Sequence, residues 1–356
     1  MTKNKAGKDK FIIGITHGDV NSTNYKMIID ICSAGNITDI FTPVFYGTSK
    51  SVSYFKKLIR NFTFNFNIVR DISGIANNRA NLFNITNEEI TITVGEPSKA
   101  AGDAALLSLQ KATESLKNSE IDALVATPLN RASMQLALDD KYTCHEQLLA
   151  SYLDNNDYMV TWVYHDFRMT SVTGKLPINQ AIGKLTAELL ESKIDMFINS
   201  LKIDFDIQKP KIAVLSLNPS YCKDSNCKEE NEIIIPVINK FKSKGDLVFG
   251  PYNADKLFSD ASYDEFDGII SMYYDQSYIP FSIFSQERGA IYLAGLPFVV
   301  TVPDSNAEMD FNSNNDNIAQ SLRTAMYLAN DITRNRQMWE EINENPLKYA
   351  SQDIEQ

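Results

Sequence analysis

The sequence predicts an α/β fold, built as a largely parallel sheet with helices on both faces. Apolar runs typical of strands alternate along the chain with segments whose apolar residues recur at helical spacing. Many of the apolar runs end in Gly, Pro, Asn or Asp, the residues that end strands at turns. With 356 residues the chain is long enough for two packed domains or for one large domain.

The segments expected in the first part of the chain follow this alternation. The helix-like segment 24–35 closes with Gly35, which suits the left-handed residue after a helix. The helix-like segment 49–62 opens with a serine cap. Strands are expected at 10–16, 41–47, 64–71 and 121–130, and a long alanine-rich helix at 99–120.

The second part continues in the same way. Segments 158–165 and 167–177 are expected to be paired strands. Further strands are expected at 211–220, 266–274 and 289–304. Helices are expected at 181–205, 231–245 and 317–339, and the Asn-rich segment 310–317 is expected to be a loop.

The composition excludes two classes of partner. The formal net charge of −11 argues against nucleic acid, because binding phosphate backbones requires a basic surface. No apolar run approaches the roughly 20 residues that span a bilayer. The apolar run after the basic start is too short for a signal peptide. We therefore expect a cytoplasmic protein with no nucleic acid and no membrane as its partner.

The four cysteines do not form the dense framework of a disulfide-rich protein, which suits a reducing compartment. Four residues separate Cys222 from Cys227, a spacing that invites a zinc interpretation. Structural zinc takes four ligands, and no second pair of cysteines or histidines accompanies these two. Loop thiols without a metal are therefore the favoured interpretation.

Polar residues follow several of the predicted strands. If the sheet is parallel, the carboxyl ends of its strands meet at one edge, where α/β proteins bind ligands. We therefore expect a cleft at that edge. The residues that would converge there are His17 and Asp19, Pro128 to Asn130, Lys175, Pro219 and Ser220, Asp275 and Gln276, and Ser305 and Asn306.

The titratable residues do not form a familiar catalytic motif. No HExxH or GxSxG motif is present, and the turn after the first strand has one glycine where a dinucleotide fingerprint has three. Of the three histidines, His17 follows the first strand, and His165 is interpreted as a surface or structural residue. His145 precedes a helix-like run, where it is either a neighbour of the helix cap or a functional group.

The order of motifs resembles that of the 4-hydroxythreonine-4-phosphate dehydrogenases of vitamin B6 biosynthesis. The matching segments, in family order, are GITHGD (14–19), PSKAAGDAALLSLQKA (97–112), IDALVATPLN (121–130), RMTSVTGKLP (168–177), KIAVLSLNPS (211–220), DGIISMYYDQ (267–276) and GLPFVVTVPD (295–304). The resemblance implies an isocitrate/isopropylmalate dehydrogenase-like fold, with two α/β/α domains around a cleft. It also implies NAD as cofactor, a small phosphorylated ligand, and a homodimer whose active site lies near the partner subunit.

On this resemblance the domains can be placed approximately. Residues 1–130 with 290–356 would form the first α/β domain. Residues 131–289 would form the second, which carries the dimer contacts and the segments that hold the metal in the family.

The family binds a divalent metal through three histidines, and all three positions differ here. The histidine of the Thr-Gly turn is replaced by Lys175, that of Asn-Pro-His by Ser220 and that of Tyr-His-Asp-Gln by Tyr274. A protonated lysine has no lone pair for a metal, and neutral serine and tyrosine are poor ligands. We therefore expect the divalent metal to be lost.

The substrate positions implied by the resemblance have also changed. His145 matches the family histidine, but Glu146 replaces the threonine after it, and a carboxylate beside a phosphate is unfavourable. Ser282, Ile291 and Val300 replace a lysine, an asparagine and an arginine. Each lost charge-assisted contact to a phosphate would be worth about 1.5–3 kcal/mol.

Three functions follow from this comparison. The leading hypothesis is a catalytically degenerate relative that binds a small molecule or regulates an active relative as a dimer. The second is an enzyme of altered, metal-independent chemistry, with the Lys175 ammonium stabilising a developing oxyanion and His145, Tyr274 and Asp275 as candidate acid–base groups. The third is the ordinary dehydrogenase reaction of pyridoxal phosphate biosynthesis, with a metal site formed from other residues.

Overall fold

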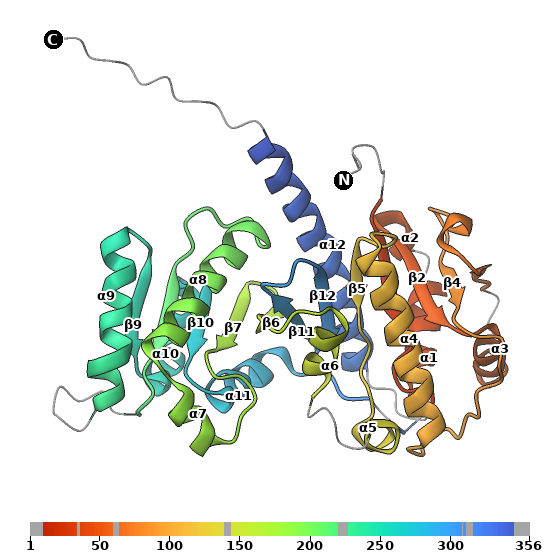
Figure 1. Cartoon of the computed structure of the whole chain (residues 1–356), viewed down its shortest axis with the longest axis horizontal. Helices are drawn as coiled ribbons and strands as arrows, with labels where there is room; N and C mark the ends of the chain where they lie inside the picture. Colours follow the sequence, from red (N-terminus) through yellow and green to blue (C-terminus); the bar gives the residue numbers. More distant parts are fainter. Residues whose placement is uncertain are drawn as a thin grey trace, which may run out of the picture.

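The computed structural model describes residues 10–33, 36–59, 64–138, 144–219, 227–307, 309–310 and 316–344. Within these residues twelve strands form one continuous sheet, in the order β3-β4-β2-β1-β5-β12-β11-β6-β7-β10-β8-β9, which runs through both halves of an elongated molecule (Figure 1). The strands are β1 (Ile12–Thr16), β2 (Thr42–Gly47), β3 (Asn67–Val69), β4 (Asn81–Asn84), β5 (Ala123–Val125), β6 (Met159–Tyr164), β7 (Phe167–Ser171), β8 (Ile212–Leu215), β9 (Val248–Tyr252), β10 (Gly268–Ser271), β11 (Ala290–Ala294) and β12 (Val299–Pro303).

Three antiparallel pairings at the centre of the sheet reverse the strand direction between its two sides. β11 is antiparallel to both β12 and β6, and β6 is antiparallel to β7, whereas the other neighbouring strands are parallel. The strands from β3 to β12 therefore run one way, and β7, β10, β8 and β9 run the other way. The expectation that all polar strand ends share one edge is wrong, because the residues after β1, β5 and β12 leave the edge opposite to those after β7, β8 and β10.

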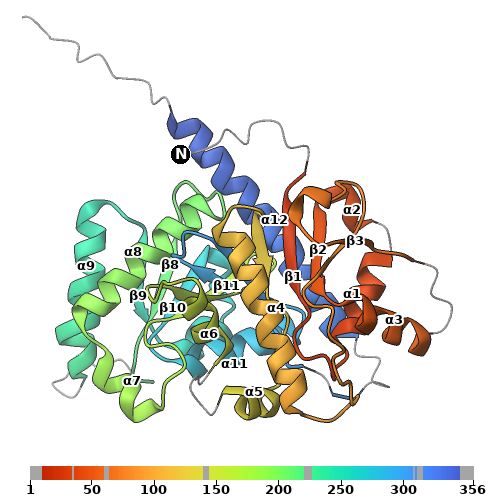
Figure 2. The ribbon, with the colours of Figure 1, turned by 45° about the vertical axis from the view of Figure 1, so that its right-hand side comes forward.

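Helices cover both faces of the sheet. α1, α3, α8, α9 and α12 pack through one set of core residues, and α4 and α6 pack on the other face, so that α4 lies in front of the sheet and α12 behind it in Figure 2. None of the described helices is both long and apolar enough to cross a membrane. The helices are α1 (Asn24–Ser33), α2 (Ile37–Ile40), α3 (Ser49–Leu58), α4 (Lys99–Lys117), α5 (Arg131–Leu138), α6 (His145–Tyr152), α7 (Ile178–Lys184), α8 (Ala187–Ile203), α9 (Ile235–Lys244), α10 (Ala254–Ser259), α11 (Tyr274–Ser285) and α12 (Asp316–Glu344), with short 3₁₀ or π turns at Ile72–Gly74, Glu230–Ile234 and Ser262–Glu265.

Several predicted elements are divided in the structure. Segment 289–304 forms two antiparallel strands, β11 and β12, because Gly295 turns the chain with φ +89° inside an apolar run. Segment 181–205 forms α7 and α8, since Thr186 caps α8 by accepting from the N–H of Leu189. The strand expected at 266–274 ends at Ser271, and Tyr274 begins α11. The cap of α3 is Thr48 and not a serine.

The α/β fold class predicted from the sequence is confirmed. The division into two domains stays a prediction. β11, which was assigned to the first expected domain, pairs on one side with β12 and on the other with β6 of the second. The join between the two halves therefore lies at these antiparallel strands, and the candidate site lies over them.

Candidate functional site

A cavity of about 790 Å³ lies over the face of the central antiparallel strands. Its floor is formed by Val160 and Trp162 of β6, Ile291 of β11 and Val302 of β12. These side chains share one face because Ile291 is paired with both Trp162 and Val302. The walls come from the loops after β5, β7 and β12 and from α6 and α11, so the cleft lies on a sheet face and not at a strand-end edge.

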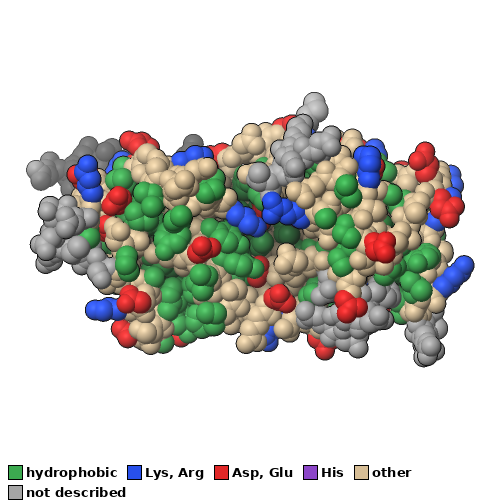
Figure 3. Space-filling view, turned by 90° about the horizontal axis from the view of Figure 1, so that it is seen from below, with side chains coloured by type: hydrophobic (Ala, Val, Ile, Leu, Met, Phe, Trp, Pro, Cys, Tyr) green, Lys and Arg blue, Asp and Glu red, His purple; other side chains and the backbone are tan. Residues whose placement is uncertain are grey.

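The surface view shows a hollow with basic side chains beside it (Figure 3). Among the described residues, four cations line the cavity, namely Arg131, Lys175, Lys184 and Lys193. Lys193 is held at the wall, because its ammonium donates to the carbonyl oxygen of Tyr158 at 2.9 Å and lies 3.7 Å from the carboxylate of Asp157.

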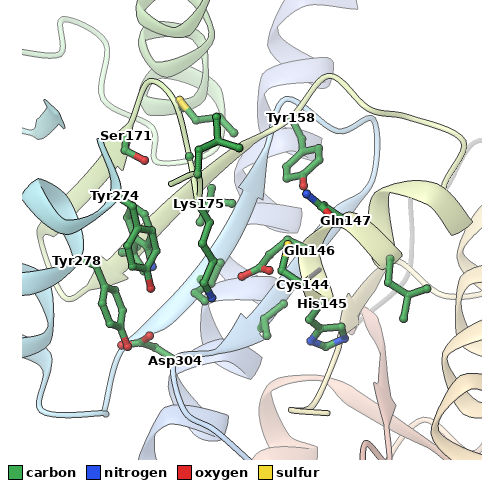
Figure 4. Close-up of a pocket in the computed structure, with 18 of the residues that line it drawn as sticks. Cys144, His145, Glu146, Gln147, Tyr158, Ser171, Lys175, Tyr274, Tyr278 and Asp304 are labelled. Atoms are coloured by element: carbon green, nitrogen blue, oxygen red, sulfur yellow. The ribbon is translucent and has the colours of Figure 1, made fainter. Parts of the chain in front are cut away.

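His145 and Glu146 enter the cavity from the first turn of α6, where Cys144 is the N-cap residue (Figure 4). Burial lowers the pKa of His145 to about 4, so its imidazole is neutral at physiological pH. The Nε2 atom of His145 is buried and has no hydrogen-bond partner among the described residues. A neutral imidazole with an unoccupied nitrogen is able to accept from or donate to a bound molecule.

Lys175 lies on the loop after β7, next to Gly174, which has φ +64° and lets the loop turn towards the cavity. Its Nζ atom lies 5.4 Å from the centroid of the Tyr274 ring. In Figure 4 the Lys175 side chain extends between the tyrosines on one side and Glu146 on the other. A lysine so placed gains a cation–π contact and brings a positive charge into the cavity.

Tyr274 begins α11 and belongs to an aromatic cluster on the cavity wall. Its ring is stacked on Tyr278 with centroids 5.1 Å apart and meets Trp162 edge-on at 5.5 Å. Burial, followed by the nearby carboxylates of Glu146 and Asp304, raises the pKa of the Tyr274 hydroxyl. The phenol is therefore protonated at neutral pH and is a hydrogen-bond donor, not an anionic ligand.

The positions that bind metal in the family do not fit a divalent ion here. Lys175 and Tyr274 both face the cavity, but one is a cation and the other a protonated phenol. The third position, Ser220, lies outside the described residues. Within the described ranges, no three His, Cys, Asp or Glu side chains are grouped to hold a metal ion. Cys222, the partner of Cys227 in the zinc interpretation, also lies outside the described residues.

Three predicted residues lie away from the cavity. Asp275 is exposed on α11 and does not line it. The hydroxyl of Ser282 donates to the carbonyl oxygen of Ile279 within the same helix. Val300 lies on the same face of β12 as Val302, but it is fully buried in the core cluster under α4 and α6 and does not line the cavity. The positions that supply a lysine and an arginine in the family thus contribute no charge to this cavity.

The two remaining histidines also lie elsewhere. His165 is an exposed residue of the turn between β6 and β7, with φ +52°. His17 follows β1 and is completely buried, and neither of its ring nitrogens has a partner among the described residues.

Side-chain hydrogen bonds connect the segment after β1 to the segment after β5. Asn24 donates from Nδ2 to the carbonyl oxygen of Pro128 at 2.9 Å, and Thr127 donates from Oγ1 to the carbonyl oxygen of Thr16 at 2.8 Å. The space between β1 and β5, where the strand order changes direction, is a frequent ligand site in open α/β sheets. In this chain it is filled by Asn24 and its neighbours.

Sequence reasoning missed Asp304, Tyr278 and Ser171 as site residues. Asp304 follows β12 and is 4% exposed, and its carboxylate accepts from the hydroxyls of Tyr278 and Ser285. Burial raises the pKa of Asp304 to about 6. The Ser171 hydroxyl, 5% exposed, lines the cavity without a partner among the described residues. The only sequence signal for Asp304 was its place at the end of a strand.

The comparisons with known proteins agree with the sequence resemblance. The family described as pyridoxal phosphate biosynthetic protein PdxA matches residues 39–329. A 4-hydroxythreonine-4-phosphate dehydrogenase from Bacteroides thetaiotaomicron is 36% identical over 344 residues, covering 96% of this chain and 94% of the relative. A D-threonate 4-phosphate dehydrogenase from Salmonella typhimurium is 28% identical over 243 residues, covering 67% of this chain and 74% of the relative.

A solved structure shares the fold. The crystal structure of 4-hydroxythreonine-4-phosphate dehydrogenase from Klebsiella pneumoniae matches with a TM-score of 0.75 and 23% identity, covering 91% of this chain and all of the other. The motif order, the extent of the family match and the identity to the Bacteroides thetaiotaomicron relative agree with one another. The chain therefore belongs to the PdxA family of pyridoxal phosphate biosynthetic proteins.

Proposed function

We propose that this family member does not catalyse the metal-dependent dehydrogenation of 4-hydroxythreonine 4-phosphate and instead binds a small molecule in its cavity. The observation that carries the proposal is the contact between Lys175 and Tyr274. Two positions that hold a metal in the family are occupied here by an ammonium and by the aromatic ring next to it. A divalent cation at this place would meet electrostatic repulsion from Lys175 and find few lone pairs.

The changed charges of the cavity support a changed ligand. Glu146 points a carboxylate into the cavity, and Asp304 places a second one at its wall. The positions of the family's lysine and arginine, Ser282 and Val300, contribute no compensating charge. A doubly charged phosphate bound as in the family would therefore lose attraction and gain repulsion.

A homodimer belongs to the same proposal. Four isoleucines on α7 and α11 are exposed, namely Ile178 (54%), Ile182 (45%), Ile279 (56%) and Ile283 (65%). Hydrophobic side chains gather on the face shown in Figure 3, which is the side where these two helices lie. Apolar groups presented together in this way are typical of an interface. The composition supports a cytoplasmic location for this dimer.

The dimer is tested by light scattering coupled to size-exclusion chromatography. We expect Ile283→Asp to shift the mass towards that of a monomer, because a buried charge at an apolar interface is costly. Ile342→Asp is the matched control, since Ile342 is 72% exposed near the end of α12. A wild-type mass of one chain at micromolar concentration would rule the dimer out.

The loss of the dehydrogenase reaction is tested by NAD reduction. Purified protein is mixed with 4-hydroxythreonine 4-phosphate, NAD and zinc, magnesium or manganese. We expect no NADH formation and no thermal shift with the metals, and titration of NAD alone shows whether the cofactor is still bound. Turnover that a chelator abolishes would overturn the proposal. Turnover that survives chelation but is lost in Lys175→Ala would instead favour metal-independent catalysis.

A gain-of-function variant makes this test sharper. The triple substitution Lys175→His, Ser220→His and Tyr274→His returns the family's three ligands to their positions. We expect zinc to raise the Tm of this variant and not that of the wild type. A variant with Lys184→His in place of Lys175→His is the control, because it adds three imidazoles while keeping the Lys175 charge.

A further inference from the structure

We infer that the Lys175 ammonium is a tethered cation, which offsets part of the negative charge of Glu146 and Asp304 inside the cavity in place of a dissociable metal ion. This inference rests on the proposed function, because it assumes that no metal occupies the same place. It goes further in giving Lys175 a defined role: because the ammonium is covalently attached to the chain, it supplies a positive charge that cannot dissociate from the cavity.

Among the described residues, two carboxylates inside the cavity create the need for a cation, while the third that lines it, Glu287, is exposed to solvent. Asp304 is 4% exposed, and its partners are neutral hydroxyls, those of Tyr278 and Ser285. Glu146 faces the same cavity from α6, and both carboxylates contribute to raising the pKa of the Tyr274 hydroxyl. Carboxylates removed from water are unfavourable unless positive charge and hydrogen bonds compensate them.

Lys175 is placed to supply that charge. Its Nζ atom lies 5.4 Å from the Tyr274 centroid, and Figure 4 shows the side chain reaching between Tyr274 and Glu146 towards Asp304. Its field acts on the groups of both walls, since it favours the ionised forms of Asp304 and Cys144. Lys193, another lining cation, is engaged by Asp157 and Tyr158.

The tethered charge has two consequences for what the cavity binds. A divalent ion is repelled by the ammonium, and a free organic cation meets a site in which Lys175 already offsets part of the carboxylate charge. Removing only the charge of Lys175 leaves the carboxylates and the aromatic rings of Tyr274, Tyr278 and Trp162 in place. Such a set of rings and carboxylates suits a small ammonium ion, which combines cation–π and charge-assisted contacts.

The test is chemical rescue of Lys175→Met, which keeps the length of the side chain and removes its charge. We expect its Tm to lie several degrees below that of the wild type. Methylammonium chloride should restore most of this loss, whereas sodium chloride of equal ionic strength should not. The wild type, Lys175→Arg and Lys184→Met should respond equally to the two salts, because each keeps a cation at position 175.

Two results would overturn the inference. One is a Tm of Lys175→Met equal to or above that of the wild type. The other is a recovery that sodium chloride produces as well as methylammonium does, which would indicate general screening. Failure of the proposed function is seen separately, as NAD reduction that a chelator abolishes in the wild type.

Discussion

Arg336 on α12 donates a hydrogen bond from Nε to Oδ1 of Asp204, at the end of α8, over 2.7 Å. The same guanidinium donates to the hydroxyl of Tyr292 on β11 at 2.7 Å, and that hydroxyl donates to Oδ2 of Asp204 at 2.9 Å. Asp204 and Tyr292 are buried. This closed network joins α8, α12 and the central strand beneath the cavity, so it fixes the platform on which the site lies.

The network predicts a large loss of stability when its cation is removed. Arg336→Met leaves the buried Asp204 carboxylate without its ion pair, and we expect the free energy of unfolding to fall by about 3–5 kcal/mol. Arg334→Met is the control, because Arg334 pairs with Asp331 on the exposed surface, where such pairs contribute about 0–1 kcal/mol. Urea unfolding followed by circular dichroism measures both, and equal losses in the two variants would contradict the expectation.

The close packing of α4 against α5 gives a second prediction. A Cβ atom at Gly102 would lie 2.3 Å from the carbonyl oxygen of Ser133 and 2.8 Å from the Cβ of Ala137. Backbone must move to admit it, so we expect Gly102→Ala to destabilise the protein by about 1–3 kcal/mol. Gly183 in α7 has open space at the same atom, and Gly183→Ala should be neutral or stabilise by up to about 1 kcal/mol. Thermal unfolding measures both effects: we expect the Tm to fall in Gly102→Ala and to stay unchanged or rise in Gly183→Ala.

The sequence was most informative where chemistry lies within a short motif. The turn carrying Lys175 and the segment carrying Tyr274 could be placed by motif order, and the structure brings both to the same cavity. The family and the α/β fold followed from the same order of motifs, and both are confirmed.

The position of the cavity could not be predicted, because it depends on the direction of strands. The reversal at β6 and β11 requires the turn at Gly295, which is hidden within a continuous apolar run. Without that turn, Trp162 and Ile291 could not be placed on one face, and Asp304 could not be recognised as a wall residue. Val300 was assigned to the site by alignment alone; it lies on the same face of β12 as Val302 but is fully buried in the core cluster that also contains Leu148 and Leu149 of α6.

Buried His17 predicts an acid-dependent loss of stability. Burial lowers the pKa of His17 to about 4, from 6.5 in the unfolded chain. Between these pH values the unfolded state binds more protons than the folded state. The contribution of His17 to the free energy of unfolding is therefore fully present above pH 6.5 and is lost as the pH falls towards 4. We expect His17→Gln to gain about 2–3 kcal/mol relative to the wild type between pH 7 and pH 4.5.

The measurement is urea unfolding at several pH values, with His165→Gln as the control. His165 is exposed in a turn, so its substitution should leave the slope of stability against pH unchanged. His145 is present in all three proteins and cancels from the comparison. A parallel pH profile for His17→Gln and the wild type would show that His17 does not carry this dependence.

Cys144 reports the charges of the cavity directly. Burial, and then the carboxylate of Glu146, raises the pKa of the Cys144 thiol to about 11, while the charge of Lys175 lowers it. Because the thiolate is the reactive form, alkylation of Cys144 by iodoacetamide at pH 8 should be roughly a hundredfold slower than that of an exposed thiol. Glu146→Gln should accelerate it severalfold, and Lys175→Met should slow it further. Peptide mass spectrometry measures the alkylation rate at Cys144, and Lys184→Met is the control. If Glu146→Gln and Lys175→Met changed this rate in the same direction, the cause would be altered access to the thiol and not altered charge.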